Sequence, residues 1–360
     1  MKKILEKILN QKDTIKKINL SEQYSLTKIP EIIKECLQLE TLDVSHTEIT
    51  EIPDFVFQLP KLKELNYLGC EKLKSQPKFL CSHQNLKKLS IYIPKKQAIS
   101  EALKNISSLK SIIISGEVKD IPNLIYDLAS LEELELFDTK ISTVSEKIER
   151  LKNLKKISFW QGLFLNEKPI TLKLDEIFQN LSKCANLQEL NLNKNGIEEI
   201  PESIALLKQL QKFSASDNKL KSYPNSIYKL TKLKEIDLGI NQIIGLPAGI
   251  GNLKQLKSLK LNSNWKNKLD TKNLFNEIDQ LENLEILELW SCQSIREIPE
   301  TISNLKKLKK LDLDNNLLEH LPQSLSNMRH LKTLRISTNK IVLEDISKLK
   351  NQLTSTNIIV

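Results

Sequence analysis

A nine-residue pattern that returns every 23 residues constrains the fold of this chain more than any other feature. Residues 187–195, 210–218, 233–241 and 256–264 each carry apolar residues at the first, fourth and sixth positions and asparagine at the ninth. A fixed period of this length is typical of a solenoid, in which each repeat contacts only its neighbours. We therefore expect the 360 residues to form one continuous repeat array rather than two or three globular domains.

The pattern covers nearly the whole chain. A partial coil begins at residue 15, and thirteen full coils follow. They open at Leu39, Leu62, Leu86, Leu109, Leu131, Leu154, Leu187, Leu210, Leu233, Leu256, Leu284, Leu308 and Leu331. Two coils, residues 154–186 and 256–283, are longer, and their apolar spacing predicts a loop followed by an amphipathic helix. Ordinary length variation, a local change of curvature and a loop that touches a partner all remain open for them.

Each letter of the pattern has a physical reason. Positions four to six are expected to form a short strand that pairs in parallel with the next coil, with the leucines turned inward. An Ile-Pro pair in the second half of many coils, such as Ile200-Pro201, predicts the first position of a short helical turn. The ninth-position amide can satisfy buried backbone groups of adjacent coils. The expected asparagine ladder is Asn195, Asn218, Asn241, Asn264, Asn316 and Asn339.

The two ends of the array are predicted to be covered, because terminal coils expose their core. Residues 1–14 are expected to form an amphipathic capping helix, since Glu6 and Lys7 interrupt the apolar stretch that a signal peptide would need. The repeat domain then spans 15–342, and 343–360 forms a C-terminal cap. No apolar run approaches the roughly 18 residues needed to span a bilayer.

The 23-residue, Pro-containing repeat resembles the Ras-group and bacterial type of leucine-rich repeat. That resemblance implies an α/β repeat solenoid, a leucine-rich repeat horseshoe with a parallel concave sheet and short helical or 3-10 convex segments. It also implies a non-catalytic scaffold that binds a protein on its concave face, in settings such as signal transduction. Regulators of a small GTPase or a phosphatase occur in the family, but fold alone does not name the partner. We expect a monomer.

The residues carry no catalytic or cofactor signature. Phosphate-binding, nucleophile-elbow and zinc-protease motifs are missing from the sequence, so we expect neither an enzyme nor a cofactor. His46 and Cys70 would lie on adjacent coils, but two ligands are too few for a zinc site, and no metal is expected. The five dispersed cysteines fit free thiols in a reducing compartment, and hence the cytoplasm.

A stripe of aromatic residues in the first half of the array is the candidate binding surface. Position seven, which should face solvent on the concave side, is Leu68, Tyr92, Ser115, Phe137 and Trp160 in five successive coils, with Ile93 and Ile113 nearby. Aromatic anchors with charged neighbours are typical of interface hot spots. The full predicted set is Leu68, Tyr92, Ile113, Glu133, Glu135, Phe137, Asp138 and Trp160, with Trp290 as a second, isolated candidate. Two alternatives are a local phase slip that buries some of them and a fold-back of the segment from Gly162 over Trp160.

Two other functions remain as alternatives. The first is an effector or surface-associated factor, exported without a recognisable signal, that binds host proteins. The second is a nucleic-acid or membrane-surface binder driven by the net charge of +9. Lysines that enter the strands are interleaved with acids and no basic, aromatic-studded motif occurs, which disfavours specific nucleic-acid recognition.

Overall fold

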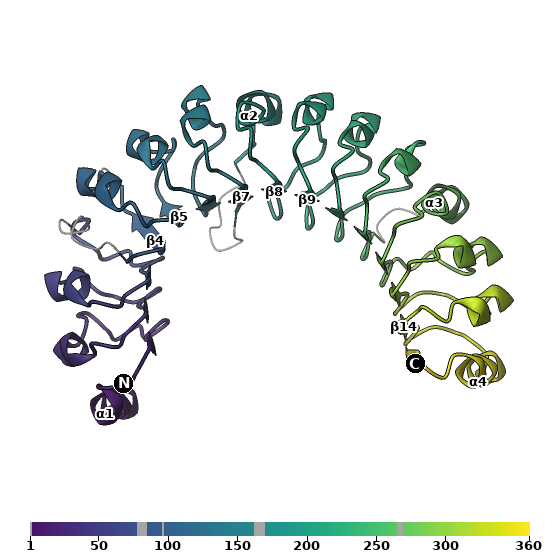
Figure 1. Cartoon of the computed structure of the whole chain (residues 1–360), viewed down its shortest axis with the longest axis horizontal. Coiled ribbons are helices and arrows are strands. Elements are labelled where there is room, and N and C mark those ends of the chain that lie inside the picture. The colour runs from purple at the N-terminus through teal and green to yellow at the C-terminus, as the bar shows by residue number, and fades with distance from the viewer. Residues whose placement is uncertain (1, 78–84, 96, 162–169, 265–268) are drawn as a thin grey trace. The chain divides into compact units, whose positions relative to one another are not determined.

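The computed structural model describes residues 2–77, 85–95, 97–161, 170–264 and 269–360. The chain divides into two compact units, Met1–Leu187 and Gln188–Val360. Within each unit, the strand of one coil pairs in parallel with the strand of the next, in chain order. Among the described residues, helical segments lie on one side of the sheet and leave its other face, here called the open face, uncovered (Figure 1). The predicted fold-back of the segment from Gly162 over Trp160 falls on residues 162–169, outside the described residues. The predicted repeat solenoid with a parallel sheet is confirmed.

In the first unit, strands alternate with short helical segments. The strands are β1 Lys17–Asn19, β2 Thr41–Asp43, β3 Glu64–Asn66, β4 Lys88–Ile93, β5 Ser111–Gly116, β6 Glu133–Phe137 and β7 Lys156–Trp160. The helical segments are α1 Lys2–Gln11, the 3-10 turns η1 Glu31–Glu35, η2 Asp54–Gln58, η4 Glu101–Asn105, η5 Asn123–Asp127 and η6 Glu146–Arg150, and the helix α2 Leu174–Leu181.

The second unit repeats this alternation. Its strands are β8 Glu189–Asn191, β9 Lys212–Ser214, β10 Glu235–Asp237, β11 Ser258–Lys260, β12 Ile286–Glu288, β13 Lys310–Asp312, β14 Thr333–Arg335 and β15 Asn357–Ile359. Its helical segments are η7 Glu202–Leu206, η8 Asn225–Lys229, η9 Ile250–Asn252, α3 Thr271–Ile278, η10 Glu300–Asn304, η11 Gln323–Asn327 and α4 Leu343–Gln352. Over the residues described above, no helix combines the length and the apolar character that a bilayer crossing requires.

The strands begin one residue earlier than the pattern predicts, at position three instead of four. Sheet hydrogen bonding explains the shift, because the carbonyl at position two already accepts from the next coil. The carbonyl of Gln188, for example, accepts the N–H groups of Gln211 and Lys212 at 2.7 and 3.0 Å. Pairing therefore starts before the first buried strand residue, Leu190.

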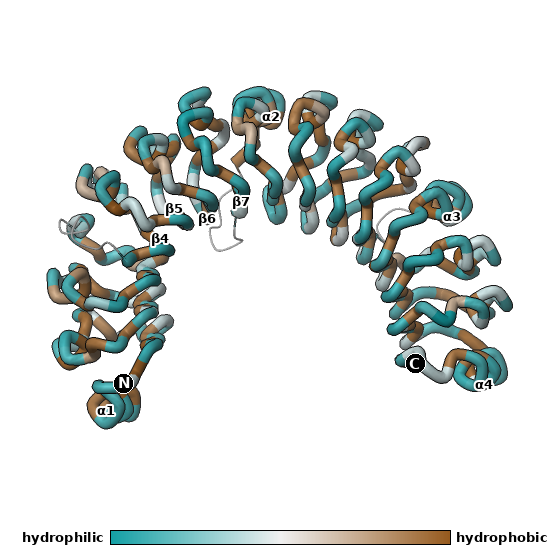
Figure 2. The backbone as a smooth tube through the Cα atoms, viewed as in Figure 1, coloured by the Kyte–Doolittle hydropathy of each residue, from teal (hydrophilic) through white to brown (hydrophobic). Residues whose placement is uncertain are grey.

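The core lies between the strands and the helical segments of each coil, where apolar residues recur on both sides (Figure 2). Proline sits one residue before the helical segment rather than at its first position. Pro201, at φ −74° and ψ 158°, is extended and precedes η7. Its carbonyl accepts the N–H of Ile204 at 3.1 Å, which is the first hydrogen bond of the turn. Proline has no backbone N–H, but a residue at this position does not need one to form the turn.

Side-chain amides at position nine join the coils of the second unit. The Nδ2 group of Asn241 donates to the carbonyls of Ala215, in the preceding coil, and Leu238, in its own, at 2.9 and 3.1 Å. Its Oδ1 accepts the N–H of Leu220 at 3.0 Å. The residue just before it, Ile240, has a positive φ of 54°, which turns the chain away from the sheet. The equivalent position-six carbonyl of the preceding coil accepts the side-chain amide of four other asparagines, Asn218, Asn264, Asn316 and Asn339.

Shorter side chains take this role where asparagine is missing. Cys292 donates its thiol to the carbonyl of Leu261 at 3.4 Å, and Cys70 donates to that of Val44 at 3.2 Å. Thr47 bonds the same Val44 carbonyl at 2.7 Å. The buried carbonyls of Leu261 and Val44 therefore keep a side-chain donor even without the amide.

Charged residues at position two form a ridge along the edge of the sheet. Glu132 lies between two lysines of neighbouring coils, Lys110 at 3.0 Å and Lys155 at 2.6 Å. Glu40 and Glu285 are flanked by lysines in the same way. Hydrogen bonds from the two lysines lower the pKa of the Glu132 carboxyl group. The lysines at this edge of the sheet are thus neutralised in part by shared carboxylates.

Helices and a strand lie at the outer coils of the two units. In α1, Ile8 is buried, and Lys12, just beyond the helix, forms an ion pair with Glu35 at 2.6 Å. After α4, the last described segment is β15, which pairs in parallel with β14 through Asn357 and Thr333. The two long coils contain the predicted helices as α2 and α3, whereas the loops expected before them fall largely on residues 162–169 and 265–268, outside the described residues.

Replacing Asn241 with alanine should destabilise the protein strongly. Loss of the side chain leaves the buried Leu220 N–H without an acceptor, at about 1–3 kcal/mol, whereas the Ala215 carbonyl still accepts the amide of Asn218 at 2.9 Å. Urea unfolding measures the change. The matched control is Asn225→Ala on the exposed helical side, which should alter the unfolding free energy by less than about 0.5 kcal/mol. Equal midpoints for the two variants would contradict the bridging role.

Candidate protein-interaction surface

The strands β4–β7 are longer than the other described strands. β4 and β5 have six residues and β6 and β7 have five, whereas the remaining strands have three. Because side chains alternate between the two faces of a strand, each long strand presents positions three, five and seven to the open face. This part of the first unit therefore offers a wider patch of side chains than the three-residue strands do.

Strand register places these side chains in two rows across the sheet. Tyr92 lies opposite Ser115, Ser115 opposite Phe137, and Phe137 opposite Trp160. We call Tyr92, Ser115, Phe137 and Trp160 the aromatic row. Two residues earlier on each strand lies the second row, which consists of Ser90, Ile113, Glu135 and Ser158.

The large side chains of both rows are partly exposed, while the small ones are buried. Tyr92, Ile113, Phe137 and Trp160 are all half-buried. Ser115 is only 3% exposed although it belongs to the aromatic row, which differs from its expected exposure. Its hydroxyl donates to the carbonyl of Ile91 at 3.3 Å, so a short side chain between two aromatic residues stays against the sheet.

Ile93, expected beside the exposed stripe, is buried, with 1% of its surface accessible. β4 continues as a strand through this residue instead of turning at position eight. The alternation therefore carries Ile93 to the core side, together with Ile91. The irregular coil changes the direction of this side chain, as a phase slip would, but leaves Tyr92 on the open face.

Phe137 and Trp160 are in contact across β6 and β7. Their ring centroids are 4.4 Å apart with an interplanar angle of 59°. Tilted aromatic pairs at this distance contribute about 0.5–1.5 kcal/mol beyond their buried area. The contact holds both rings in one arrangement, which lowers the conformational entropy that a partner must remove on binding.

Tyr92 is held through its backbone by a buried glutamine that the sequence reasoning missed. Gln76 donates its amide to the Tyr92 carbonyl at 2.7 Å and accepts the hydroxyl of Tyr67 at 3.0 Å. The sequence does mark this residue as unusual, because Gln76 precedes Pro77 at the position where other coils have isoleucine, as in Ile121-Pro122. Burial, reinforced by nearby carboxylates, raises the pKa of the Tyr92 hydroxyl.

The three predicted acidic residues differ in their surroundings. Glu133 lies opposite Lys156 in the register of β6 and β7. Glu135 lies between Ile113 and Ser158, so neither residue opposite it carries a charge. Asp138 follows β6 at a positive φ of 47° and belongs to the turn rather than to either row. Only Glu135 is a carboxylate within the apolar part of the surface.

Leu68 and Trp290 lie apart from the two rows. Leu68 is half-buried in the turn after β3, where its N–H donates to Asn66 Oδ1 at 3.1 Å. Trp290 is half-buried and follows β12 in the second unit, with its carbonyl accepting the N–H of Ser263 at 2.8 Å. The structure thus brings together Tyr92, Ile113, Glu133, Glu135, Phe137 and Trp160 and does not bring Leu68 into their rows.

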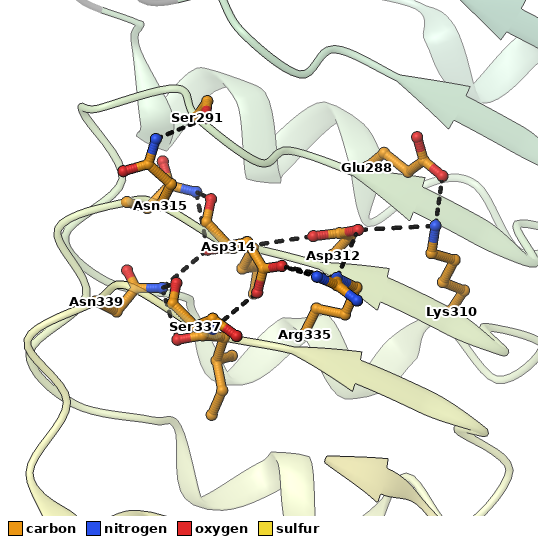
Figure 3. Close-up of polar contacts among 12 residues, drawn as sticks. Glu288, Ser291, Lys310, Asp312, Asp314, Asn315, Arg335, Ser337 and Asn339 are labelled. Carbon is orange, nitrogen blue, oxygen red and sulfur yellow. Dashed lines mark hydrogen bonds and ion pairs between the residues drawn. The ribbon is translucent and has the colours of Figure 1, made fainter. Parts of the chain in front are cut away.

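On the open face of the second unit, the charged side chains of β12–β14 and the turns after them are paired with one another (Figure 3). Arg335 donates to Asp314 at 2.7 Å, and Lys310 donates to Glu288 at 2.7 Å. Asp312, only 5% exposed, lies 3.4 Å from Arg335 and 3.7 Å from Lys310, and burial raises the pKa of its carboxyl group. A partner that bound here would have to replace these internal contacts, whereas the aromatic row offers surface to be buried.

The cysteines serve packing and backbone bonding in the part of the chain that is described. Cys36, Cys70, Cys184 and Cys292 are free and buried. Burial raises the pKa of the Cys184 and Cys292 thiols to about 11, so both stay protonated at neutral pH. Outside the segments left undescribed, no three His, Cys, Asp or Glu side chains gather as a metal would require.

Comparison with known families identifies the class of protein that this fold defines. A "Leucine-rich repeat region" profile matches residues 163–293, a "Leucine rich repeat" profile matches 282–341, and a "BspA type Leucine rich repeat region" profile matches 1–100 and 79–168. The chain is a leucine-rich repeat protein.

The curated proteins that this chain resembles are larger than it is. The volume-regulated anion channel subunit LRRC8B of Homo sapiens is 30% identical over 165 residues, which are 46% of this chain and 17% of the relative. Subunit LRRC8A of Rattus norvegicus is 28% identical over 45% of this chain and 23% of the relative. The chain therefore spans less than a quarter of the length of these curated relatives.

Solved structures share the fold over more of the chain. A leucine-rich repeat protein of Leptospira interrogans, LIC12759, is 25% identical with a TM-score of 0.57, over 99% of this chain and 98% of that one. TLR13, in a complex with ssRNA13, is 21% identical with a TM-score of 0.69, over 91% of this chain and 46% of that one. The second likeness shows the fold alone.

Adjacent residues of β6 should respond differently to truncation. Leu136 is 2% exposed, so Leu136→Ala is expected to cost about 2–5 kcal/mol of unfolding free energy. Phe137→Ala should cost only about 1 kcal/mol, because the side chain is half-buried and loses mainly its contact with Trp160. Chemical denaturation of both variants checks this. A larger loss for Phe137→Ala would show that this ring belongs to the core.

Proposed function

We propose that this chain is a non-catalytic protein-binding module whose partner docks on the open face of β4–β7. One observation carries the proposal: strand register sets Tyr92, Phe137 and Trp160 in one row, with each side chain partly exposed. Partly exposed aromatic side chains bury large area at a low entropic cost, and they dominate binding energy at many interfaces.

The sheet beneath the row supports this function because it is rigid before binding. Backbone hydrogen bonds join all four strands, and the Phe137–Trp160 contact and the Gln76 bond to Tyr92 restrict the three aromatic residues further. A preorganised surface loses little entropy when it is occupied. Charged side chains around it, including Glu133 and Lys156, resemble the polar rim of an interface.

The distribution of the basic residues supports a protein partner over nucleic acid or an anionic membrane. Although the chain carries a net charge of +9, Lys110 and Lys155 share Glu132, and Lys63 is paired with Glu40. Binding to a phosphate backbone requires lysines that are available to neutralise phosphates and so release the counterions condensed on the nucleic acid. Glu133 and Glu135 on the candidate surface itself would repel phosphates.

We further propose that the coils are of the 23-residue, Pro-containing Ras-group type. The extended prolines Pro53, Pro201 and Pro299, each one residue before a 3-10 turn, support this subtype. The free, buried thiols support a protein of a reducing compartment, the cytoplasm, because disulfides are rare there.

A pull-down from the native source tests the binding function. Wild type and a variant with Tyr92→Ala, Phe137→Ala and Trp160→Ala are compared under physiological salt. Each true anchor is expected to contribute roughly 2 kcal/mol or more, a factor of about 30 in affinity, so the triple variant should lose the specific partner.

The matched control is Tyr24→Ala, since Tyr24 is 71% exposed but lies outside both rows. It should retain the partner. Identical partner lists for wild type and the triple variant would show that the aromatic row does not bind. Capture that disappears after nuclease treatment or at moderately raised salt would instead favour the charge-driven alternative.

A further inference from the structure

The second row carries a charge pattern that specifies the chemistry of the partner. Glu135 is half-buried, and its in-register neighbours are Ile113 and Ser158. No cation of the described chain lies within 4.0 Å of its carboxylate, although ion pairs of that length are common along the sheet edge. A carboxylate that has lost part of its hydration and has no cation beside it is stabilised when a partner supplies a cationic group.

Glu133, on the same strand, has a different balance. It is exposed, and Lys156 lies opposite it in the strand register. Neither glutamate forms an ion pair with a cation among the described residues, but a lysine faces Glu133 across the strands, whereas Ile113 and Ser158 face Glu135. The two glutamates therefore form a matched pair, one with a basic neighbour opposite and one without.

A second polar group beside Glu135 also lacks a partner. Ser158 is 3% exposed, lies on the second row, and its hydroxyl oxygen makes no hydrogen bond with any described residue of the chain. Buried hydroxyl groups are satisfied in the great majority of native structures. The Ser158 hydroxyl is thus an unused acceptor in register with the Glu135 carboxylate.

Aromatic rings lie within reach of the same point. Phe137 and Trp160 each stand two residues beyond the second row on β6 and β7, roughly 7 Å along the strands. A cation within about 6 Å of a ring centroid is attracted to its face. Phe137 and Trp160 are therefore the next aromatic side chains along the strands from a headgroup bonded to Glu135.

We infer that Glu135, Ser158 and the Phe137–Trp160 pair together receive the guanidinium group of a partner arginine that is flanked by an apolar side chain. This inference rests on the proposed function and specifies its partner. A guanidinium group is planar, binds a carboxylate through two parallel hydrogen bonds and stacks on aromatic faces. A lysine ammonium offers the charge without the plane, and an acidic segment is repelled. Ile113, which lies opposite Glu135 in the strand register, is the apolar surface that the flanking side chain of the partner would contact.

Selection from a random dodecapeptide phage library tests the inference without knowledge of the native partner. The full chain is immobilised as wild type, Glu135→Gln, Glu64→Gln and Trp160→Ala. Peptides from the wild type should be enriched about tenfold in arginine next to an aliphatic or aromatic residue. Glu135→Gln should lose the arginine enrichment, whereas Glu64→Gln should keep it, because Glu64 is an exposed glutamate of β3 that lies outside both rows.

One selected peptide is then measured in solution with its arginine replaced by citrulline, which has nearly the same shape but no charge. Its affinity for wild type should fall at least about tenfold and should hardly change for Glu135→Gln. Equal binding of both peptides to wild type, or equal arginine enrichment on wild type and Glu135→Gln, would overturn the inference.

The outcomes also separate this inference from the proposed function. Peptides that depend on Trp160 but not on arginine would keep the aromatic row as the binding surface and remove only the guanidinium site. Peptides indifferent to Trp160→Ala would show that the row itself is not used.

Discussion

Every coil of this protein must satisfy backbone groups where the chain leaves the sheet, because they are buried between neighbours. In the second unit an asparagine amide meets this demand, as Asn241 does by donating to Ala215 of the preceding coil and accepting from Leu220. The solution fixes three things together: the strand has three residues, the chain turns at a left-handed residue, and the coil is bonded to the one before it. With the strand, the turn and the bond between coils fixed, the leucine side chains have little freedom in how they pack.

The candidate surface arises where that solution is not used. The slots after β4, β5 and β6 hold Pro94, Glu117 and Thr139, and these strands run on to five or six residues. Backbone groups that an asparagine would have satisfied are paired along the longer sheet instead. Each additional pair of residues also brings one more side chain to the open face, and Tyr92, Phe137 and Trp160 occupy those positions. The loss of the asparagine at position nine and the widening of the open face at β4–β7 are therefore two results of the same change in strand length.

Much of this architecture could be predicted from the sequence, because the period places every leucine on the core side. The positions of Tyr92, Phe137 and Trp160 on one stripe also followed from the phase. The burial of Ile93 did not, since it depends on how far β4 continues, and strand length is set by pairing with β5 rather than by local residues. Ser115 was assigned by its position alone, without allowance for large neighbours. The role of Gln76 could be predicted only by assuming that a polar residue at a position that is normally apolar must have a buried hydrogen-bond partner.

The shared carboxylates along the sheet edge bear on how such an array can change in length. Glu132 lies between Lys110 and Lys155, so the order of charges across three consecutive coils is basic, acidic, basic. Removing the coil of β6 would set Lys110 beside Lys155, and like charges on adjacent strands repel each other. Duplicating the β7 coil would create a similar clash. The repeats resemble one another in their apolar positions, yet this edge makes them non-interchangeable, and it opposes the unequal exchange of units by which repeat arrays grow and shrink.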